Sequence, residues 1–140
     1  MNEPRARLVG EAMTRGLVTI HANAQLYEAA QLMDAHRVHG LPVVDEDRNV
    51  VGILSQTDLL RVRSIENLWP GLVGLAVRHL MTTPAITVSV SASLDEAAKI
   101  MKGRRIHRLI VIGSDGCTPV GMISVSDLVH VMAAEEAPQL

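Results

Sequence analysis

The chain has 140 residues, 48% of them hydrophobic and 20% charged, which is long enough for one domain with a real core and excludes general disorder. Its formal net charge of −2 argues against nucleic-acid binding by bulk electrostatic attraction, and one Trp, one Tyr and no Phe exclude base-stacking platforms. No apolar run is long enough to span a bilayer, no secretory leader is recognisable, and a lone Cys117 cannot form an internal disulfide. We therefore expect a cytoplasmic protein without membrane association.

The first half of the chain predicts the order strand, helix, strand, strand, helix. Residues Leu17–Ile20 form a short β-rich run, and apolar residues then recur at helical spacing at Leu26, Ala29, Ala30 and Met33. Two apolar runs, Leu41–Val44 and Val50–Leu54, flank turn residues and predict a hairpin, and a second helix begins after Ser55.

The second half repeats this pattern at an offset of 68 residues. Of the 31 positions from Met13 to Val43, 13 are identical to their counterparts from Met81 to Val111, against about two expected by chance. The offset becomes 69 after the turn of the hairpin, where an inserted residue costs little. Ala85–Val88 is the equivalent strand, and Met33, Met101 and Met122 are expected in the core.

Neither repeat is long enough to be stable alone, so we expect an α/β fold of two β-α-β-β-α repeats packed through their sheets with pseudo-two-fold symmetry. We predict a tail at residues 1–10, repeat 1 at 11–63, a connector at 64–76, repeat 2 at 77–132 and a tail at 133–140. Trp69, beside Pro70, is either a packing anchor of the connector or part of a partner surface.

A Gly-x-x-Ser-x-x-Asp motif ends the hairpin in each repeat, with Ser55 and Asp58 in the first and Ser124 and Asp127 in the second. As a capping box, the serine accepts a bond from the backbone of the third helical residue, whose carboxylate reaches back. A carboxylate at a helix N-terminus can also accept the two hydroxyls of a ribose, beside backbone donors suited to an anion. Both interpretations are compatible.

Basic residues precede the hairpin of the second repeat, in the sequence Arg104-Arg105-Ile106-His107-Arg108. Such residues commonly complement the dipole at the end of a helix. Because they continue to the start of the next strand, they are also suited to hold a phosphate.

The duplicated unit resembles a tandem pair of CBS domains, also called a Bateman module. The resemblance rests on Met-Thr near the start of each repeat, on Glu-Ala-Ala in the first helix, on Gly40-Leu41-Pro42-Val43-Val44-Asp45 and on Gly-x-x-Ser-x-x-Asp. It implies a regulatory, energy-sensing module that binds AMP, ADP or ATP, with S-adenosylmethionine and NAD as secondary candidates.

By that resemblance, one site combines residues of the first motif with a basic pair of the second repeat: Ser55, Gln56, Thr57, Asp58, His107 and Arg108. A weaker second site combines Ser124, Val125, Ser126, Asp127, His39 and Gly40, with Gly40 in place of the basic residue. Candidates for the adenine pocket are Thr19, Ile20, Thr87, Val88 and Ile112.

The predicted partners are the adenine nucleotide, a second copy of the chain in a homodimer and a separate regulated protein. The alternative function is a structural dimerisation or protein-interaction module that binds no ligand. Scattered His residues do not form a metal site, no Gly-x-Ser-x-Gly elbow supports a hydrolase, and neither an enzyme nor a catalytic cofactor is expected.

Overall fold

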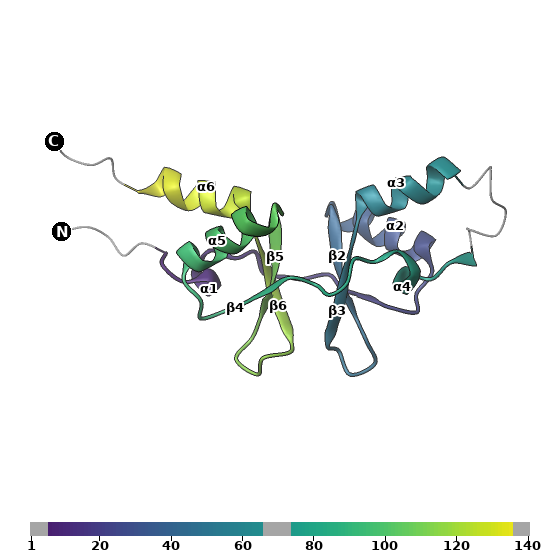
Figure 1. Cartoon of the computed structure of the whole chain (residues 1–140), viewed down its shortest axis with the longest axis horizontal. Coiled ribbons are helices and arrows are strands. Elements are labelled where there is room, and N and C mark those ends of the chain that lie inside the picture. The colour runs from purple at the N-terminus through teal and green to yellow at the C-terminus, as the bar shows by residue number, and fades with distance from the viewer. Residues whose placement is uncertain (1–5, 66–73, 136–140) are drawn as a thin grey trace. The chain divides into compact units, whose positions relative to one another are not determined.

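The computed structural model describes residues 6–65 and 74–135, so the predictions for Trp69 lie outside the described residues. Two compact units make up the chain, and each is described by itself. Residues Val18–Ala85 form the central unit, and Met1–Leu17 with Ile86–Leu140 form the terminal unit (Figure 1). Neither unit coincides with a predicted repeat, because residues 11–17 of the first repeat belong to the terminal unit and residues 77–85 of the second repeat belong to the central unit.

The central unit contains a three-stranded sheet with the order β1-β2-β3, formed by β1 (Ile20–His21), β2 (Gly40–Val44) and β3 (Val50–Ser55). Strand β1 is parallel to β2, and β2 is antiparallel to β3. Helix α2 (Leu26–His36) connects the two parallel strands, and α3 (Gln56–Ile65) follows β3 directly. The predicted order of elements is confirmed for this repeat.

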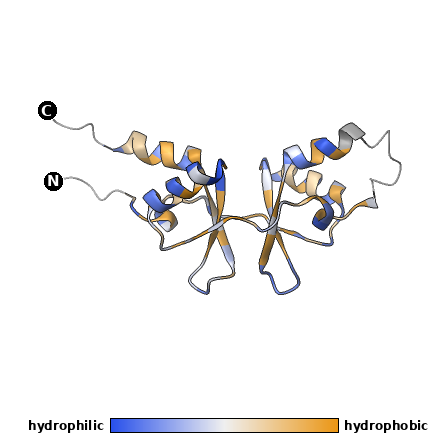
Figure 2. Ribbon diagram, in the orientation of Figure 1, coloured by the Kyte–Doolittle hydropathy of each residue, from blue (hydrophilic) through white to orange (hydrophobic). Residues whose placement is uncertain are grey.

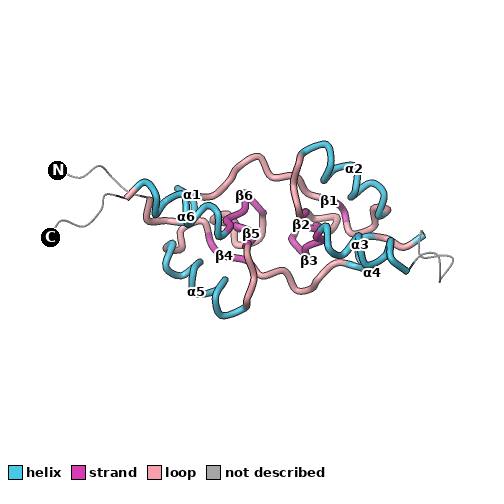
Figure 3. Tube along the Cα trace, turned by 90° about the horizontal axis from the view of Figure 1, so that it is seen from above, coloured by secondary structure: helices cyan, strands magenta, loops and turns pink. Residues whose placement is uncertain are grey.

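The terminal unit has the same topology, with the strand order β4-β5-β6. Its strands are β4 (Thr87–Ser89), β5 (Arg108–Ile112) and β6 (Pro119–Ser124), and its main helices are α5 (Leu94–Arg104) and α6 (Val125–Ala134). In each unit the two main helices lie on one side of the sheet (Figure 3). The α/β class and the duplicated strand-helix-strand-strand-helix order are thus confirmed.

Each unit has its own aliphatic core between its sheet and its helices. In the central unit, Leu41, Val43 and Leu54 of the sheet pack with Ala29 and Met33 of α2. The terminal unit repeats this arrangement with the corresponding residues Leu109, Val111, Ile123, Ala97 and Met101. Because the inward residues alternate along the strands, the strand register determines which side chains enter the core.

Two short segments, residues 8–14 and 76–82, complete these cores and are called the crossing segments below. Residues 8–14 include α1 (Val9–Ala12), precede the central unit in sequence and pack in the terminal unit. Residues 76–82 include α4 (Val77–Leu80), precede β4 and pack in the central unit. Val9 and Val77 are both fully buried in these cores.

Backbone hydrogen bonds attach each crossing segment to the last strand of its unit. Thr82 and Ile53 exchange two N–H···O bonds of 2.9 and 3.1 Å, and Thr14 and Met122 exchange two of 2.8 and 3.1 Å. An edge strand in each sheet therefore gains a partner that covers part of its open side.

Glycine is required where the crossing segments approach the strands. A Cβ atom at Gly121 would lie 2.7 Å from the carbonyl oxygen of Thr14 and 2.8 Å from Sδ of Met13. At Gly52 it would lie 2.8 Å from both the carbonyl oxygen of Thr82 and Sδ of Met81. The glycine of the Gly-x-x-Ser-x-x-Asp motif is therefore a packing residue.

Several local features differ from the predictions or were not predicted. Helices α1 and α4 were not predicted, and β1 and β4 begin later than the apolar runs, because only Ile20–His21 and Thr87–Ser89 reach the neighbouring strand. Ala30 and Ala98 are exposed. In each helix the alanine and methionine that face the core are Ala29 with Met33 and Ala97 with Met101, and the next alanine lies at the edge of the apolar stripe, in solvent. Met33 and Met101 are buried as predicted, whereas Met122 alternates to the opposite face of β6 and is half-buried.

We expect the excised segment 18–85 to fold and the excised segment 9–65, which contains the first sequence repeat, to remain unfolded. The first retains Val77, which completes its core, whereas the second lacks Val77 and carries Val9 without its binding partners. Urea unfolding followed by far-UV circular dichroism is expected to show a cooperative transition only for 18–85. Equal transitions for both segments would contradict the assignment of the crossing segments.

Replacing Gly121 by Ala is expected to destabilise the protein by about 1–3 kcal/mol, because the backbone of Thr14 must move away from the new methyl group. Gly103→Ala is the matched control, since a Cβ there meets nothing within 4 Å and the residue lies in α5. The control is expected to stabilise by roughly 0.5–1 kcal/mol. A loss below about 0.5 kcal/mol for Gly121→Ala would show that the segment adjusts without cost.

Candidate functional site

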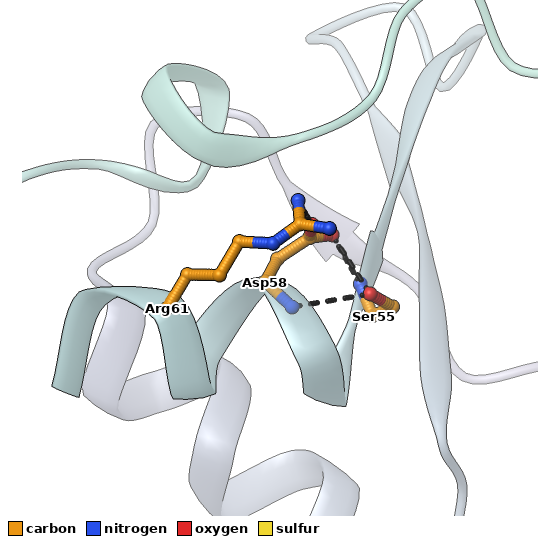
Figure 4. Close-up of polar contacts among 3 residues, drawn as sticks. All are labelled: Ser55, Asp58 and Arg61. Atoms are coloured by element: carbon orange, nitrogen blue, oxygen red, sulfur yellow. Dashed lines mark hydrogen bonds and ion pairs between the residues drawn. The ribbon is translucent and has the colours of Figure 1, made fainter. Parts of the chain in front are cut away.

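The Ser-x-x-Asp motif of the central unit joins β3 to α3 and forms the predicted capping box (Figure 4). Oδ2 of Asp58 accepts hydrogen bonds from the backbone N–H of Ser55 at 2.8 Å and from its hydroxyl at 2.9 Å. In return, the N–H of Asp58 donates to Oγ of Ser55 at 3.2 Å. Asp58 is only 7% exposed, so these bonds hold an otherwise costly buried carboxylate.

The terminal unit repeats this geometry at the start of α6. Oδ2 of Asp127 accepts from the N–H and the hydroxyl of Ser124 at 2.8 and 3.1 Å, and the N–H of Asp127 donates to Oγ of Ser124 at 3.2 Å. The structural part of the motif prediction is therefore confirmed in both repeats.

The second carboxylate oxygen, Oδ1, has a different partner in each unit. Nη1 of Arg61, one turn further along α3, donates to Oδ1 of Asp58 at 3.4 Å. In the terminal unit, the hydroxyl of Thr14 on the crossing segment donates to Oδ1 of Asp127 at 3.3 Å. The sequence analysis identified neither contact, although the spacing of three residues between Asp58 and Arg61 is typical of helical ion pairs.

His107 and Arg108 lie next to the serine–aspartate motif of their own unit. The carbonyl oxygen of His107 accepts from the N–H of Val125 at 2.9 Å, and Arg108 is paired with Ser124 across β5 and β6. His107 is exposed and Arg108 is half-buried. The backbone of both residues is therefore paired with residues at the start of the Ser124–Asp127 motif.

His39 and Gly40 occupy the equivalent place in the central unit. The carbonyl oxygen of His39 accepts from the N–H of Gln56 at 2.9 Å, and Gly40 is paired with Ser55. The two ligand sites predicted from the sequence each take residues from both units, so they stay predictions.

The remaining candidates divide between surface and core. Four lie exposed on the first turns of the helices, namely Gln56, Thr57, Val125 and Ser126. Of the adenine candidates, Ile20 and Val88 are each 5% exposed and belong to the two cores, whereas Thr19 is half-buried and Thr87 is exposed. Ile112 is 8% exposed and alternates on β5 with the core residue Val111.

The hairpin loops carry acidic residues that form turns. Oδ1 of Asp45 accepts from the N–H groups of Asp47 and Asn49, each at 2.9 Å. In the other hairpin, Asp115 accepts hydrogen bonds from the hydroxyl of Thr118 and from the N–H groups of Cys117 and Thr118. These bonds, the one from the Thr118 hydroxyl most of all, lower the pKa of the Asp115 carboxyl to about 2. Each of these two carboxylates is thus hydrogen-bonded to groups of its own loop.

Over residues 6–65 and 74–135, no three His, Cys, Asp or Glu side chains are grouped so that they could hold a metal ion. Over the same ranges, no helix has both the length and the apolar character needed to cross a membrane.

The structure has a groove of about 600 Å³ between α2 and α3, which the sequence did not predict. Its walls include Tyr27, Ala30, Leu59, Leu60 and Val62. Tyr27 and Leu60 are 58% and 67% exposed, so the groove is an apolar surface on the outer side of the helices.

Among known proteins, the chain is similar to an inosine-5'-monophosphate dehydrogenase of Aquifex aeolicus, with 30% identity over 112 residues. The match covers 80% of this chain but only 22% of that enzyme, so it concerns a small part of the dehydrogenase.

Two solved structures are similar over nearly their whole length. CBSX2 in complex with AMP has 28% identity and a TM-score of 0.77, with coverage of 90% of this chain and 96% of that one. The CBS domain of a bacterial CNNM/CorC family Mg²⁺ transporter in complex with ATP has 26% identity and a TM-score of 0.77, with coverage of 92% and 89%.

The CBS domain family matches residues 9–65 and 77–134, which together make up most of the chain. The two matched segments correspond to the two repeats with their crossing segments, and each contains one serine–aspartate motif. The chain therefore belongs to the CBS domain family and carries two CBS domains in tandem.

Proposed function

We propose that this chain is a regulatory module that binds an adenine nucleotide and signals its presence to a separate protein in the cytoplasm. The observation that carries the proposal is the use of the two carboxylate oxygens. In both units the capping box uses Oδ2 alone, while Oδ1 accepts from a side chain outside the box. A cap requires no second oxygen, so Oδ1 is the oxygen through which this carboxylate can accept hydrogen bonds from a ribose.

A nucleotide site must also bind phosphate, and the second repeat contains basic residues suited to this. Arg104, Arg105 and His107 are exposed and Arg108 is half-buried, and no acidic residue interrupts the sequence that they share. Guanidinium groups bind phosphate oxygens bidentately and remain charged at every physiological pH. Similar CBS proteins solved with AMP and with ATP support an adenine nucleotide as the ligand class.

The stronger site of the proposal takes Asp58 for the ribose, with Ser55, Gln56 and Thr57 beside it, and His107 and Arg108 for the phosphates. The weaker site takes Ser124, Val125, Ser126 and Asp127 with His39, where Gly40 supplies no charge. This assignment follows the pattern of the family. The adenine would meet a subset of Thr19, Ile20, Thr87, Val88 and Ile112.

We expect Asp58→Ala and Arg108→Ala each to weaken AMP or ATP binding by about 10–150-fold, because each removes hydrogen bonds to or from a charged group. Asp127→Ala is the matched control for Asp58→Ala, since it removes the same capping bonds in the other unit and is expected to weaken binding less. Lys99→Ala is the control for Arg108→Ala, since it removes one exposed positive charge of α5. Isothermal calorimetry measures all four variants.

Thermal unfolding of each variant is measured first, because losing a helix cap costs about 1 kcal/mol of stability. If Asp127→Ala abolishes binding while Arg108→Ala leaves it intact, the stronger site has been assigned to the wrong aspartate. If the wild-type chain binds none of AMP, ADP, ATP, S-adenosylmethionine and NAD, the proposed ligand binding is wrong and the alternative, an interaction module without a ligand, is favoured.

We also propose that the chain forms a homodimer through the outer faces of its helices. Val125, Val129 and Met132 follow one another at helical spacing on α6 and are 41%, 56% and 67% exposed. Hydrophobic colours predominate along α6 in Figure 2. With the groove of α2 and α3, it provides apolar surface that a second copy of the chain would cover.

Sedimentation at tens of micromolar is expected to give a species of twice the 15.1 kDa chain mass. Val129→Glu is expected to weaken the dimer at least about tenfold, since it places a charge where burial of a valine contributes roughly 1.5–3 kcal/mol. Gln31→Glu, at an exposed position of α2, adds the same charge and is expected to leave the dimer intact. A wild-type monomer at these concentrations would contradict the proposal.

A further inference from the structure

Asp58 has little remaining capacity to accept hydrogen bonds. A carboxylate offers about four acceptor positions, two on each oxygen. The N–H and the hydroxyl of Ser55 occupy both positions on Oδ2, and Nη1 of Arg61 occupies one on Oδ1. One position on Oδ1 is left for a ligand, whereas the cis-diol of a ribose brings two hydroxyl donors.

Arg61 is the partner that can leave. Its side chain is 75% exposed while that of Asp58 is 8% exposed, and the Nη1–Oδ1 distance of 3.4 Å is longer than that of a strong ion pair. The bonds from Ser55 are shorter, at 2.8 and 2.9 Å, and belong to the helix cap. Displacing Ser55 would therefore disrupt the start of α3, whereas displacing Arg61 from Oδ1 leaves the bonds of the cap in place.

Only the central unit has this arrangement among the described residues. The position equivalent to Arg61 in the second repeat is His130, which is exposed, and Oδ1 of Asp127 accepts instead from the neutral hydroxyl of Thr14. A charged competitor for the carboxylate is thus a feature of one repeat.

We propose that Arg61 is a specificity-determining residue that competes with the ribose hydroxyls for Oδ1 of Asp58. The inference rests on the proposed function, because it assumes that Asp58 binds the ribose. A nucleotide with one hydroxyl fits the position that Arg61 leaves open, whereas a nucleotide with two must displace Arg61. Arg61 therefore reduces the preference of this site for ribonucleotides over deoxyribonucleotides.

The test compares AMP with 2′-deoxy-AMP, whose phosphate and base are the same. The ratio of their Kd values isolates the hydroxyl, because any effect of Arg61 on the phosphate cancels. Arg61→Ala is expected to raise the ratio Kd(2′-deoxy-AMP)/Kd(AMP) by about two- to fivefold, the range of an ion pair with one exposed partner. His130→Ala, the same position in the other repeat, is expected to leave the ratio unchanged.

Salt gives a second readout, since an ion pair with an exposed partner is screened. Raising NaCl from 0.05 to 0.5 M is expected to increase the ratio for the wild-type chain toward that of Arg61→Ala and to change the ratio of the variant little. Because Arg61 is an exposed helical residue and alanine favours helices, the variant is expected to fold.

Each outcome decides between the two proposals. A ratio that is unchanged in Arg61→Ala, or that rises equally in His130→Ala, would overturn the role of Arg61 while AMP binding itself stands. A wild-type chain that binds neither AMP nor 2′-deoxy-AMP would overturn the proposed function and this inference with it.

Discussion

The structure of each unit depends on the backbone pairing between a crossing segment and the last strand of the sheet. Two N–H···O bonds join Thr82 to Ile53 in the central unit, and two join Thr14 to Met122 in the terminal unit. The same segments bring Val77 and Val9 into the cores, where both are fully buried. A sheet of only three strands with two main helices obtains from this segment both apolar contacts and a covered edge.

This pairing also fixes the place of the serine–aspartate motifs. Strand β3 ends at Ser55 and β6 ends at Ser124, so a strand held by a crossing segment leads directly into a capped helix. In the terminal unit the connection is closer still, because Thr14 bonds to Asp127 as well as to the strand. The carboxylate that caps α6 is thereby linked to the N-terminal segment of the chain, whereas Asp58 is linked to its own helix through Arg61.

Local patterns were sufficient to predict the order of the main elements and both capping boxes, because each depends on residues close in sequence. The repeats were predicted from the identity of residues in the two halves of the chain. Helices α1 and α4 have four residues each, too few for periodicity to show, and are stabilised by packing on distant strands. The exchange of crossing segments could not be predicted, since the sequence does not state which sheet a short apolar segment will join. The ion pair of Asp58 with Arg61 could have been, from its spacing.

Because each unit contains a crossing segment from the other repeat, the two units cannot be completed in the same way during synthesis of the chain. All of the central unit lies between Val18 and Ala85, so its parts are complete before Ile86 leaves the ribosome. Val9 is made before every residue of that unit, yet its neighbours Val88, Leu109 and Ile123 come later than all of them. During translation the apolar side of the N-terminal crossing segment therefore stays uncovered until the residues that bury Val9 have been synthesised, and the whole central unit is synthesised before them.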